Sequence, residues 1–355
     1  MKRPLIALVL LLLATIFLPR IFNPENDTAP KQNPAPFTIS GRTMGTSYHV
    51  SVIPGTDAKV NSDALQQHID TRLQEINQRM STYIKDSELS RINQAKANTW
   101  VEVSAETAQV ISTAQKISAQ TGGAFDISVG SLVNLWGFGP EIHLYAVPEE
   151  DIIETILAQS GHTNMEVKST PPKVKKHFAS MYLDLSGIAK GYAVDQIAEL
   201  LVQQGYPNHL VEIGGEIRTG GQKGAENPWN IGIERPQSEG RSVHKVIHTS
   251  STTAMATSGD YRNYFEHQGR RYSHTIDPTT GYPISHKLAA VSVLHESCML
   301  ADAYATAFMV MGPEQSMDFA REHEVAIYML VKGEHGFISI SSPAFENFIS
   351  SRQRK

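Results

Sequence analysis

The order of helical and strand patterns along residues 37–349 constrains the fold more than any other feature of the sequence. Apolar residues recur at helical spacing in several segments, and short runs rich in Val, Ile and Tyr are typical of strands. These segments are interleaved without regular strand–helix alternation, which predicts an α+β fold with a mixed, mostly antiparallel sheet and packed helices. The expected helices are 65–80 (capped by Ser62 or Asp63), 104–121 (opened by Ser104), 148–159, 187–204 and 300–323. The expected strands are 48–53, 181–185, 209–213, 229–234, 289–294, 326–331 and 337–341, and residues 168–177 are expected to form an exposed basic loop.

Composition excludes several classes of protein. Lys and Arg number 31 against 36 Asp and Glu, a formal net charge of −5, so the chain lacks the basic excess of a nucleic-acid binder. With 41% hydrophobic and 19% charged residues the chain is globular rather than disordered. The single cysteine, Cys298, excludes an intramolecular disulfide, a Cys-x-x-Cys redox pair and a structural cysteine zinc site.

The N-terminus predicts a signal anchor or signal peptide over residues 1–22. Lys2 and Arg3 precede an apolar run, Leu5 to Leu18, that is shorter than the roughly 17–25 residues of a relaxed spanning helix. No clean small-residue cleavage site follows, which favours an uncleaved anchor over a cleaved signal. The positive-inside rule then places the body on the periplasmic side of the inner membrane. Residues 23–36 form a Pro-rich linker, residues 37–349 the body, and residues 350–355 a polar tail.

The segment 181–195 has the pattern of a strand, a turn and the start of a helix. Ser186 is a plausible N-cap, and free backbone N–H groups at such a helix start favour an anion. Lys190 adds a positive charge in the first turn, and the small residues within 187–191 let a ligand approach the backbone. The pattern fits a phosphate site, and it equally fits an ordinary strand–turn–helix with a solvated lysine.

Two further segments carry candidate side chains. His274 precedes a turn expected at 277–281, where a general base would be accessible, although a lone histidine is more often structural. Asp302 and Thr306 are four residues apart and share one helical face. Their oxygen atoms suit Mg²⁺, which completes its octahedron with substrate phosphates and water. The alternative for this pair is an N-capping aspartate and an intrahelical threonine.

Several nucleotide-binding and hydrolytic classes lack their motifs. The Gly-rich pieces at 214–216, 220–221 and 257–264 do not form a dinucleotide-binding fingerprint with its strand, helix and distant acid. The sequence also lacks GxxxxGK[ST], HExxH and GxSxG, which excludes P-loop, zincin and α/β-hydrolase sites.

Taken together, these segments resemble the ApbE family, the FAD:protein FMN transferases. Each block is weak alone, and their order along the chain makes the match specific. The resemblance spans about Phe37 to about Ser342 and is carried by 43–46, 80–83 with 87–93, 123–128, 184–195, 211–216, 258–264, 274–283 and 301–306.

The resemblance implies an ApbE-like body and a bacterial envelope enzyme that uses FAD and Mg²⁺. Such enzymes attach FMN through a phosphoester to a threonine hydroxyl of a partner and release AMP. Implied acceptors are flavin-bearing subunits of sodium-pumping NADH:quinone reductase or Rnf-type complexes. A periplasmic FAD pyrophosphatase giving FMN and AMP, or a flavin-binding protein without turnover, are the alternatives. Many members are lipoproteins, and the Cys that bears their lipid is missing here.

The family's functional residues carry over onto matching positions of this sequence. His274 is the implied base, and the implied metal ligands are Asp302, Thr306 and the backbone carbonyl of Gly187. Members with Asn at the position of Tyr83 lean toward FAD hydrolysis, so Tyr83 favours transfer. The implied FAD contacts are Met44, Tyr83, Ala124, Phe125, Asp126, Asp184, Lys190 and Ile276.

Overall fold

The computed structural model describes residues 35–55, 60–140, 146–224, 227–237, 240, 242–261 and 263–353. The expected anchor or signal at 1–22 lies outside the described residues, as does most of the linker. Within the described ranges, no helix combines the length and the apolar character needed to cross a bilayer.

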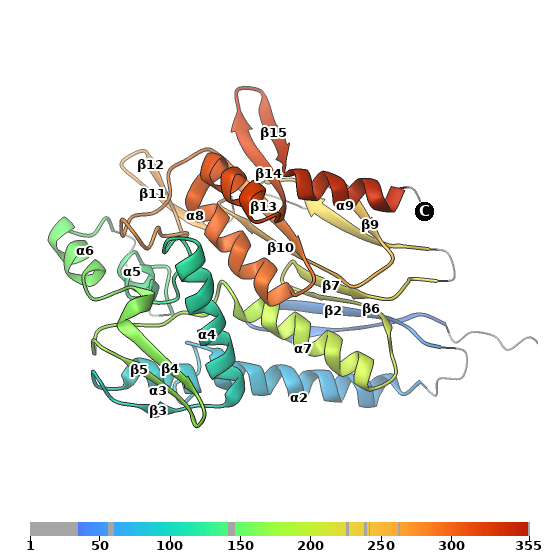
Figure 1. Cartoon of the computed structure of the whole chain (residues 1–355), viewed down its shortest axis with the longest axis horizontal. Helices are drawn as coiled ribbons and strands as arrows, with labels where there is room; N and C mark the ends of the chain where they lie inside the picture. The colour runs from blue at the N-terminus through green and yellow to red at the C-terminus, as the bar shows by residue number, and fades with distance from the viewer. Residues whose placement is uncertain are drawn as a thin grey trace, which may run out of the picture.

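An eight-stranded sheet forms the centre of the fold (Figure 1). Every neighbouring pair of strands in it is antiparallel, which confirms the predicted α+β class with a large antiparallel sheet. The strands pair in chain order, so the remaining elements are insertions between them. Across the sheet they are β1 (Phe37–Thr43), β2 (Thr46–Ile53), β6 (Asn208–Ile213), β7 (Glu216–Gly220), β10 (Thr253–Gly259), β13 (Leu288–His295), β14 (Ala326–Gly333) and β15 (Gly336–Ser341).

Long helices cover one face of this sheet (Figure 1). The helix α7 (Ala189–Gln203) packs on β6 and β7, α8 (Cys298–Glu322) packs on β10 and β13, and α2 (Ser62–Met80) packs beside α7 and β1. The hairpin β8 (Trp229–Glu234)–β9 (Val243–Thr249) covers the other face. Side chains alternate between faces along a strand, so in β10 Ala256 packs toward α8 and Met255 packs with the hairpin.

The expected helices are present, with corrections at their ends. The cap of α2 is Asn61, whose Oδ1 accepts from the Ala64 N–H at 3.0 Å, rather than Ser62 or Asp63. Ser104 caps α4 (Ala105–Gln120) as predicted. The expected cap at Ser186 is wrong, because α7 begins after Ile188 without a side-chain cap.

The helix α8 is interrupted at Gly312, which has φ 78° and ψ −179°. Pro313 follows it, and a proline suits the first turn of a helix because the N–H that it lacks has no partner there. The segment before this break carries Asp302 and Thr306, and the segment after it is a separate stretch of helix.

One expected strand and one expected loop differ from the structure. Residues 181–185 form no strand and make only a parallel bridge between Tyr182 and Val129. Asn93 holds them instead: its Nδ2 donates to the Leu183 carbonyl at 2.9 Å, and its Oδ1 accepts from the Leu183 N–H at 2.7 Å. The alternation of Met181, Leu183 and Leu185 with other residues predicts a strand, and in the structure these three side chains are indeed buried although the segment pairs with none of the described strands.

The expected exposed loop at 168–177 is a hairpin, β4 (Met165–Ser169) and β5 (Pro172–Lys176). Its last residue, Lys176, is buried, and its Nζ donates to the carbonyls of Asn93, Ala179 and Met181 at 2.5–2.9 Å. Burial lowers the pKa of Lys176 to about 8. The remaining elements are α3 (Glu88–Gln94), β3 (Val101–Glu102), α5 (Gly130–Leu135), α6 (Glu150–Leu157), η1 (His162–Asn164), β11 (Tyr264–His267), β12 (Arg270–Ser273) and α9 (Pro343–Gln353).

Candidate active site

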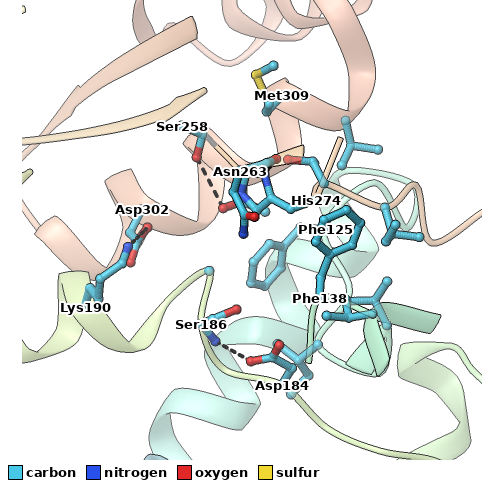
Figure 2. Close-up of a pocket in the computed structure, with 18 of the residues that line it drawn as sticks. Phe125, Phe138, Asp184, Ser186, Lys190, Ser258, Asn263, His274, Asp302 and Met309 are labelled. Atoms are coloured by element: carbon cyan, nitrogen blue, oxygen red, sulfur yellow. Dashed lines mark hydrogen bonds and ion pairs between the residues drawn. The ribbon is translucent and has the colours of Figure 1, made fainter. Parts of the chain in front are cut away.

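A cavity of about 450 Å³ gathers nearly all the residues that the sequence analysis singled out. Figure 2 shows Lys190 and Asp302 on one side of it and Phe125 and Phe138 on the other. An adjoining cavity of about 680 Å³ contains Met44 and shares part of its lining with the first. The first cavity is lined by Tyr83, Ala124, Phe125, Asp126, Asp184, Gly187, Lys190, His274, Ile276, Asp302 and Thr306, among others.

The helices α7 and α8 come close together at two glycines. The Gly191 N–H donates to Asp302 Oδ2 at 3.0 Å, and a Cβ on Gly191 would lie 2.2 Å from the Cys298 carbonyl oxygen. A Cβ on Gly187 would lie 3.0 Å from Thr306 Oγ1. Gly191 leaves no room for a side chain and Gly187 leaves little, so the oxygen atoms of Asp302 and Thr306 lie next to the backbone at, and just before, the start of α7.

Asp195 on α7 holds the start of α8. Its Oδ1 accepts from the Cys298 N–H at 2.9 Å and from Arg218 at 2.7 Å. Its Oδ2 accepts from the Met299 N–H at 3.0 Å and from Ser297 Oγ at 2.7 Å. A negative charge at a helix N-terminus also stabilises the helix dipole. Asp195 therefore fixes the helix that carries both implied metal-ligand side chains.

Lys190 lies between two buried carboxylates. Its Nζ is 2.7 Å from Glu216 Oε1 and 3.8 Å from Asp302 Oδ1. Burial opposes the ammonium charge, but Asp302 and Glu216 together raise the pKa of Lys190 above its usual value. Burial also raises the pKa of Asp302, and it raises the pKa of Glu216 to about 7. Lys190 thus remains a cation inside the cavity, ready to meet an anion.

The available donors fit Mg²⁺. Asp302 supplies a buried carboxylate, Thr306 a hydroxyl and Gly187 a backbone carbonyl, and all three are hard oxygen donors. The Ser258 hydroxyl lies 3.5 Å from Thr306 Oγ1, and the buried Glu216 Oε2 has no hydrogen-bond partner. Among the residues described, no three His, Cys, Asp or Glu side chains cluster in a way that could hold a metal. Mg²⁺ needs only one or two carboxylates when phosphate and water complete its shell.

His274 lies in the loop after β12 and keeps one ring nitrogen free to accept a proton. Both its backbone N–H and its Nδ1 lie within 3.1 Å of the Asn263 carbonyl oxygen. A carbonyl can only accept, so Nδ1 carries the proton and Nε2 keeps its lone pair. Burial lowers the pKa of His274, against smaller opposing effects of Asn263 and Asp260. The neutral ring required of a general base is therefore favoured.

The side chains expected to contact the flavin differ in their exposure and in their hydrogen-bond partners. Tyr83 is 74% exposed, and Phe125 is buried in the cavity wall. Asp184 is part-buried, accepts from the Ser186 N–H at 2.8 Å, and has its pKa raised by burial. The carboxylate of Asp126 accepts from the backbone N–H groups of Ser128 and His162, at 2.8 and 2.6 Å, and so stabilises its own loop.

Sequence reasoning assigned no role to Glu216, Ser258, Asn263 or Asp195, although each lies in one of the family-like blocks. Glu216 follows a Gly-Gly turn and begins a strand. An acidic residue directly after such a turn is a sequence feature that could have predicted a ligand-binding carboxylate. The partners of Asp195 at the start of α8 lie more than 100 residues away, and no local pattern predicts them.

Comparison with known proteins gives consistent matches over most of the chain. A model of the ApbE family matches residues 44–329. The FAD:protein FMN transferase of Vibrio cholerae is 45% identical over 314 residues, which cover 88% of this chain and 92% of that one. The solved flavin transferase ApbE from Vibrio cholerae superposes with a TM-score of 0.81 at 43% identity, covering 88% of this chain and 99% of that one. The Pseudomonas stutzeri flavinyl transferase ApbE, in its apo form, has a TM-score of 0.81 at 35% identity, covering 89% and 97%. The chain belongs to the ApbE family.

Proposed function

We propose that this chain is an enzyme that transfers FMN from FAD to a threonine hydroxyl of a partner protein, with Mg²⁺ as cofactor and AMP as the other product. One observation carries this proposal: the same cavity holds a half-buried cation, Lys190, beside the oxygens of Asp302 and Thr306, and a histidine with a free Nε2. The first set suits a pyrophosphate and the second suits a hydroxyl that must lose its proton. The names of the relatives, FAD:protein FMN transferase, support the same reaction.

FAD would lie across the two adjoining cavities, with its pyrophosphate at Lys190. The ammonium binds phosphate oxygens, and its pairing with Glu216 holds it in place. Mg²⁺, held by Asp302, Thr306 and the Gly187 carbonyl, would neutralise the negative charge that develops on the departing AMP. Phe125 and Tyr83 offer aromatic surface to the flavin.

The chemical step replaces the phosphoanhydride bond of FAD by a phosphoester bond to threonine. The threonine oxygen attacks the phosphorus of the FMN half, and the bond from that phosphorus to the bridging oxygen breaks. His274 Nε2 takes the hydroxyl proton, because Nδ1 already donates to the Asn263 carbonyl. AMP leaves with the bridging oxygen and both electrons of the broken bond.

We also infer that the N-terminal segment anchors the body to the periplasmic side of the inner membrane. The basic Lys2 and Arg3, followed by the apolar run from Leu5 to Leu18, support this location. The acceptors would be flavin-bearing subunits of sodium-pumping NADH:quinone reductase or Rnf-type complexes.

The test is incubation of the purified chain with FAD, Mg²⁺ and a soluble acceptor domain of a sodium-pumping NADH:quinone reductase. Intact mass spectrometry of the acceptor should find an FMN adduct, and EDTA should abolish it. Free FMN with an unmodified acceptor would mark an FAD pyrophosphatase, and neither product would mark a flavin-binding protein.

A further inference from the structure

A third cavity, of about 380 Å³, lies under the β8–β9 hairpin and beside the β6–β7 turn. Its lining comes from β10 and from both hairpins, and includes Glu212, Glu234 and Val243. None of the residues implied to bind FAD is among its lining residues, and all of them line the two cavities described above. This third cavity, called the groove below, is therefore space that FAD does not account for.

The groove meets the candidate active site at its metal end. Gly214, Thr257 and Gly259 line both cavities. Ser258 stands between the last two, and its hydroxyl is 3.5 Å from Thr306 Oγ1. Gly215 in the same turn has φ 108°, and a Cβ added there would meet nothing within 4 Å. The wall between groove and active site is thus mostly bare backbone.

The proposed reaction requires such an entrance. The acceptor threonine must reach the FMN phosphorus in line with the departing AMP, so it cannot approach along FAD itself. It also arrives as part of a polypeptide, which needs an open channel on either side of the threonine. The groove shares Gly214, Thr257 and Gly259 with the active-site cavity, and Val243 in its lining is 64% exposed.

The charge of the groove indicates which segment it suits. Glu212 and Glu234 line it, and its described lining contains no Lys or Arg. Glu212 Oε1 accepts from the Gly215 N–H at 2.7 Å and its Oε2 lies 2.8 Å from His49 Nδ1, so this carboxylate is fixed at the turn between the two cavities. An acidic segment would be repelled here, and a neutral or basic one would be attracted.

We propose that the groove binds the extended segment of the acceptor protein that carries the threonine, with neutral or basic residues flanking that threonine. This inference rests on the proposed transferase function. It assigns the contacts with the acceptor to the side of the sheet opposite α8, away from the FAD contacts.

The test replaces Val243 by Trp and, separately, by Arg. The matched control is Val202→Trp on α7, where the valine is 55% exposed and lines none of the three cavities. In-gel flavin fluorescence measures labelling of the soluble reductase domain, and flavin fluorescence titration measures FAD affinity. Both Val243 variants should raise the KM for the acceptor about tenfold or more, with FAD affinity within about twofold of wild type. The control should match wild type in both assays.

Other outcomes separate this inference from the proposed function. If the wild-type chain labels no acceptor, the transferase function fails and the groove assignment falls with it. If the wild type labels and both Val243 variants label equally well, only the groove assignment is overturned. If the Val243 variants keep wild-type kinetics but have an altered sedimentation coefficient, the groove is a contact between two copies of this chain. That result would also overturn the groove assignment. Replacing the two residues that flank the acceptor threonine by glutamate should raise KM further than replacing them by lysine, and the reverse order would contradict the charge argument.

Discussion

Replacing Asp195 by Asn should destabilise the protein far more than its position outside the cavity lining suggests. The carboxylate accepts four hydrogen bonds, two on each oxygen, from Arg218, Ser297 and the first turn of α8. An asparagine keeps one accepting oxygen and presents an NH₂ group where the other stood. Two donors therefore lose their acceptor, and Arg218 loses its buried counter-charge.

The expected cost follows from these contacts. Hydrogen bonds to a charged group contribute about 1.5–3 kcal/mol each, and breaking a buried ion pair costs about 3–5 kcal/mol. These contributions overlap, so we expect the free energy of unfolding to fall by about 3–5 kcal/mol. For a body of this size the Tm should fall by roughly 6–15 °C. The start of α8 should also shift, so the concentration of Mg²⁺ needed for half-maximal activity should rise.

Thermal unfolding followed by circular dichroism checks the first expectation, and a Mg²⁺ titration of activity checks the second. The matched control is Asp318→Asn, farther along α8. Its side chain is 78% exposed and pairs only loosely with Arg321 at 3.5 Å, so the change should stay within about 0.5 kcal/mol. A difference of about 1–2 °C is near the resolution of such a measurement. A Tm for Asp195→Asn that close to the wild-type value would refute the role of Asp195 in holding α8.

Four further predictions concern the site and the N-terminus. Gly191→Ala should lower stability by about 1–3 kcal/mol or more, because its methyl would lie 2.2 Å from the Cys298 carbonyl, and normal melting would contradict that close packing. Asp302→Asn should abolish the Mg²⁺-dependent part of FAD affinity, measured by flavin fluorescence with and without EDTA, while stability in metal-free buffer changes little because its amide oxygen can still accept from Gly191. For His274, burial lowers the pKa and the neutral form is the base, so kcat/KM should rise with pH through a value below about 6.5. In His274→Ala that acidic limb should vanish from the residual rate, and an unchanged pH profile would show that another group is the base. The segment Leu5–Leu18 should remain on the membrane-derived protein, and an N-terminal sequence starting near Asn23 would instead identify a cleaved signal.

Sequence patterns predicted the elements whose cause is local. The apolar spacing of residues 65–80 and the capping Ser104 depend on neighbours a few positions away, and the structure matches both. The hairpin at 165–176 was not predicted, because the lysines of β5 are typical of an exposed loop. The buried Lys176 donates to three carbonyls: those of Ala179 and Met181 lie in the segment that follows it, and that of Asn93 lies 83 residues away, where no local pattern predicts it.

In the candidate site, too, local patterns predict some residues, whereas other contacts depend on the folded structure. Asp302 and Thr306 could be paired from helical spacing, and Lys190 could be placed in the first turn of a helix. The pairing of Lys190 with Glu216 could not be predicted, because it depends on how α7 packs against the start of β7. The available Nε2 of His274 depends likewise on the Asn263 carbonyl, which only the folded loop brings within reach.

The order of the strands has a consequence for how the protein is made. Since each strand of the central sheet pairs with the preceding one, the sheet can extend in step with synthesis from its N-terminal edge. The cavity cannot form in that way, because the Gly191 N–H donates to Asp302, which is synthesised 111 residues later, and because α8 follows β13 in the chain. A nascent chain that ends before α8 would carry much of the sheet but lack the helix that completes the cavity. FAD capture is then a late event of folding, and the nucleotide stabilises only chains that are already complete through α8.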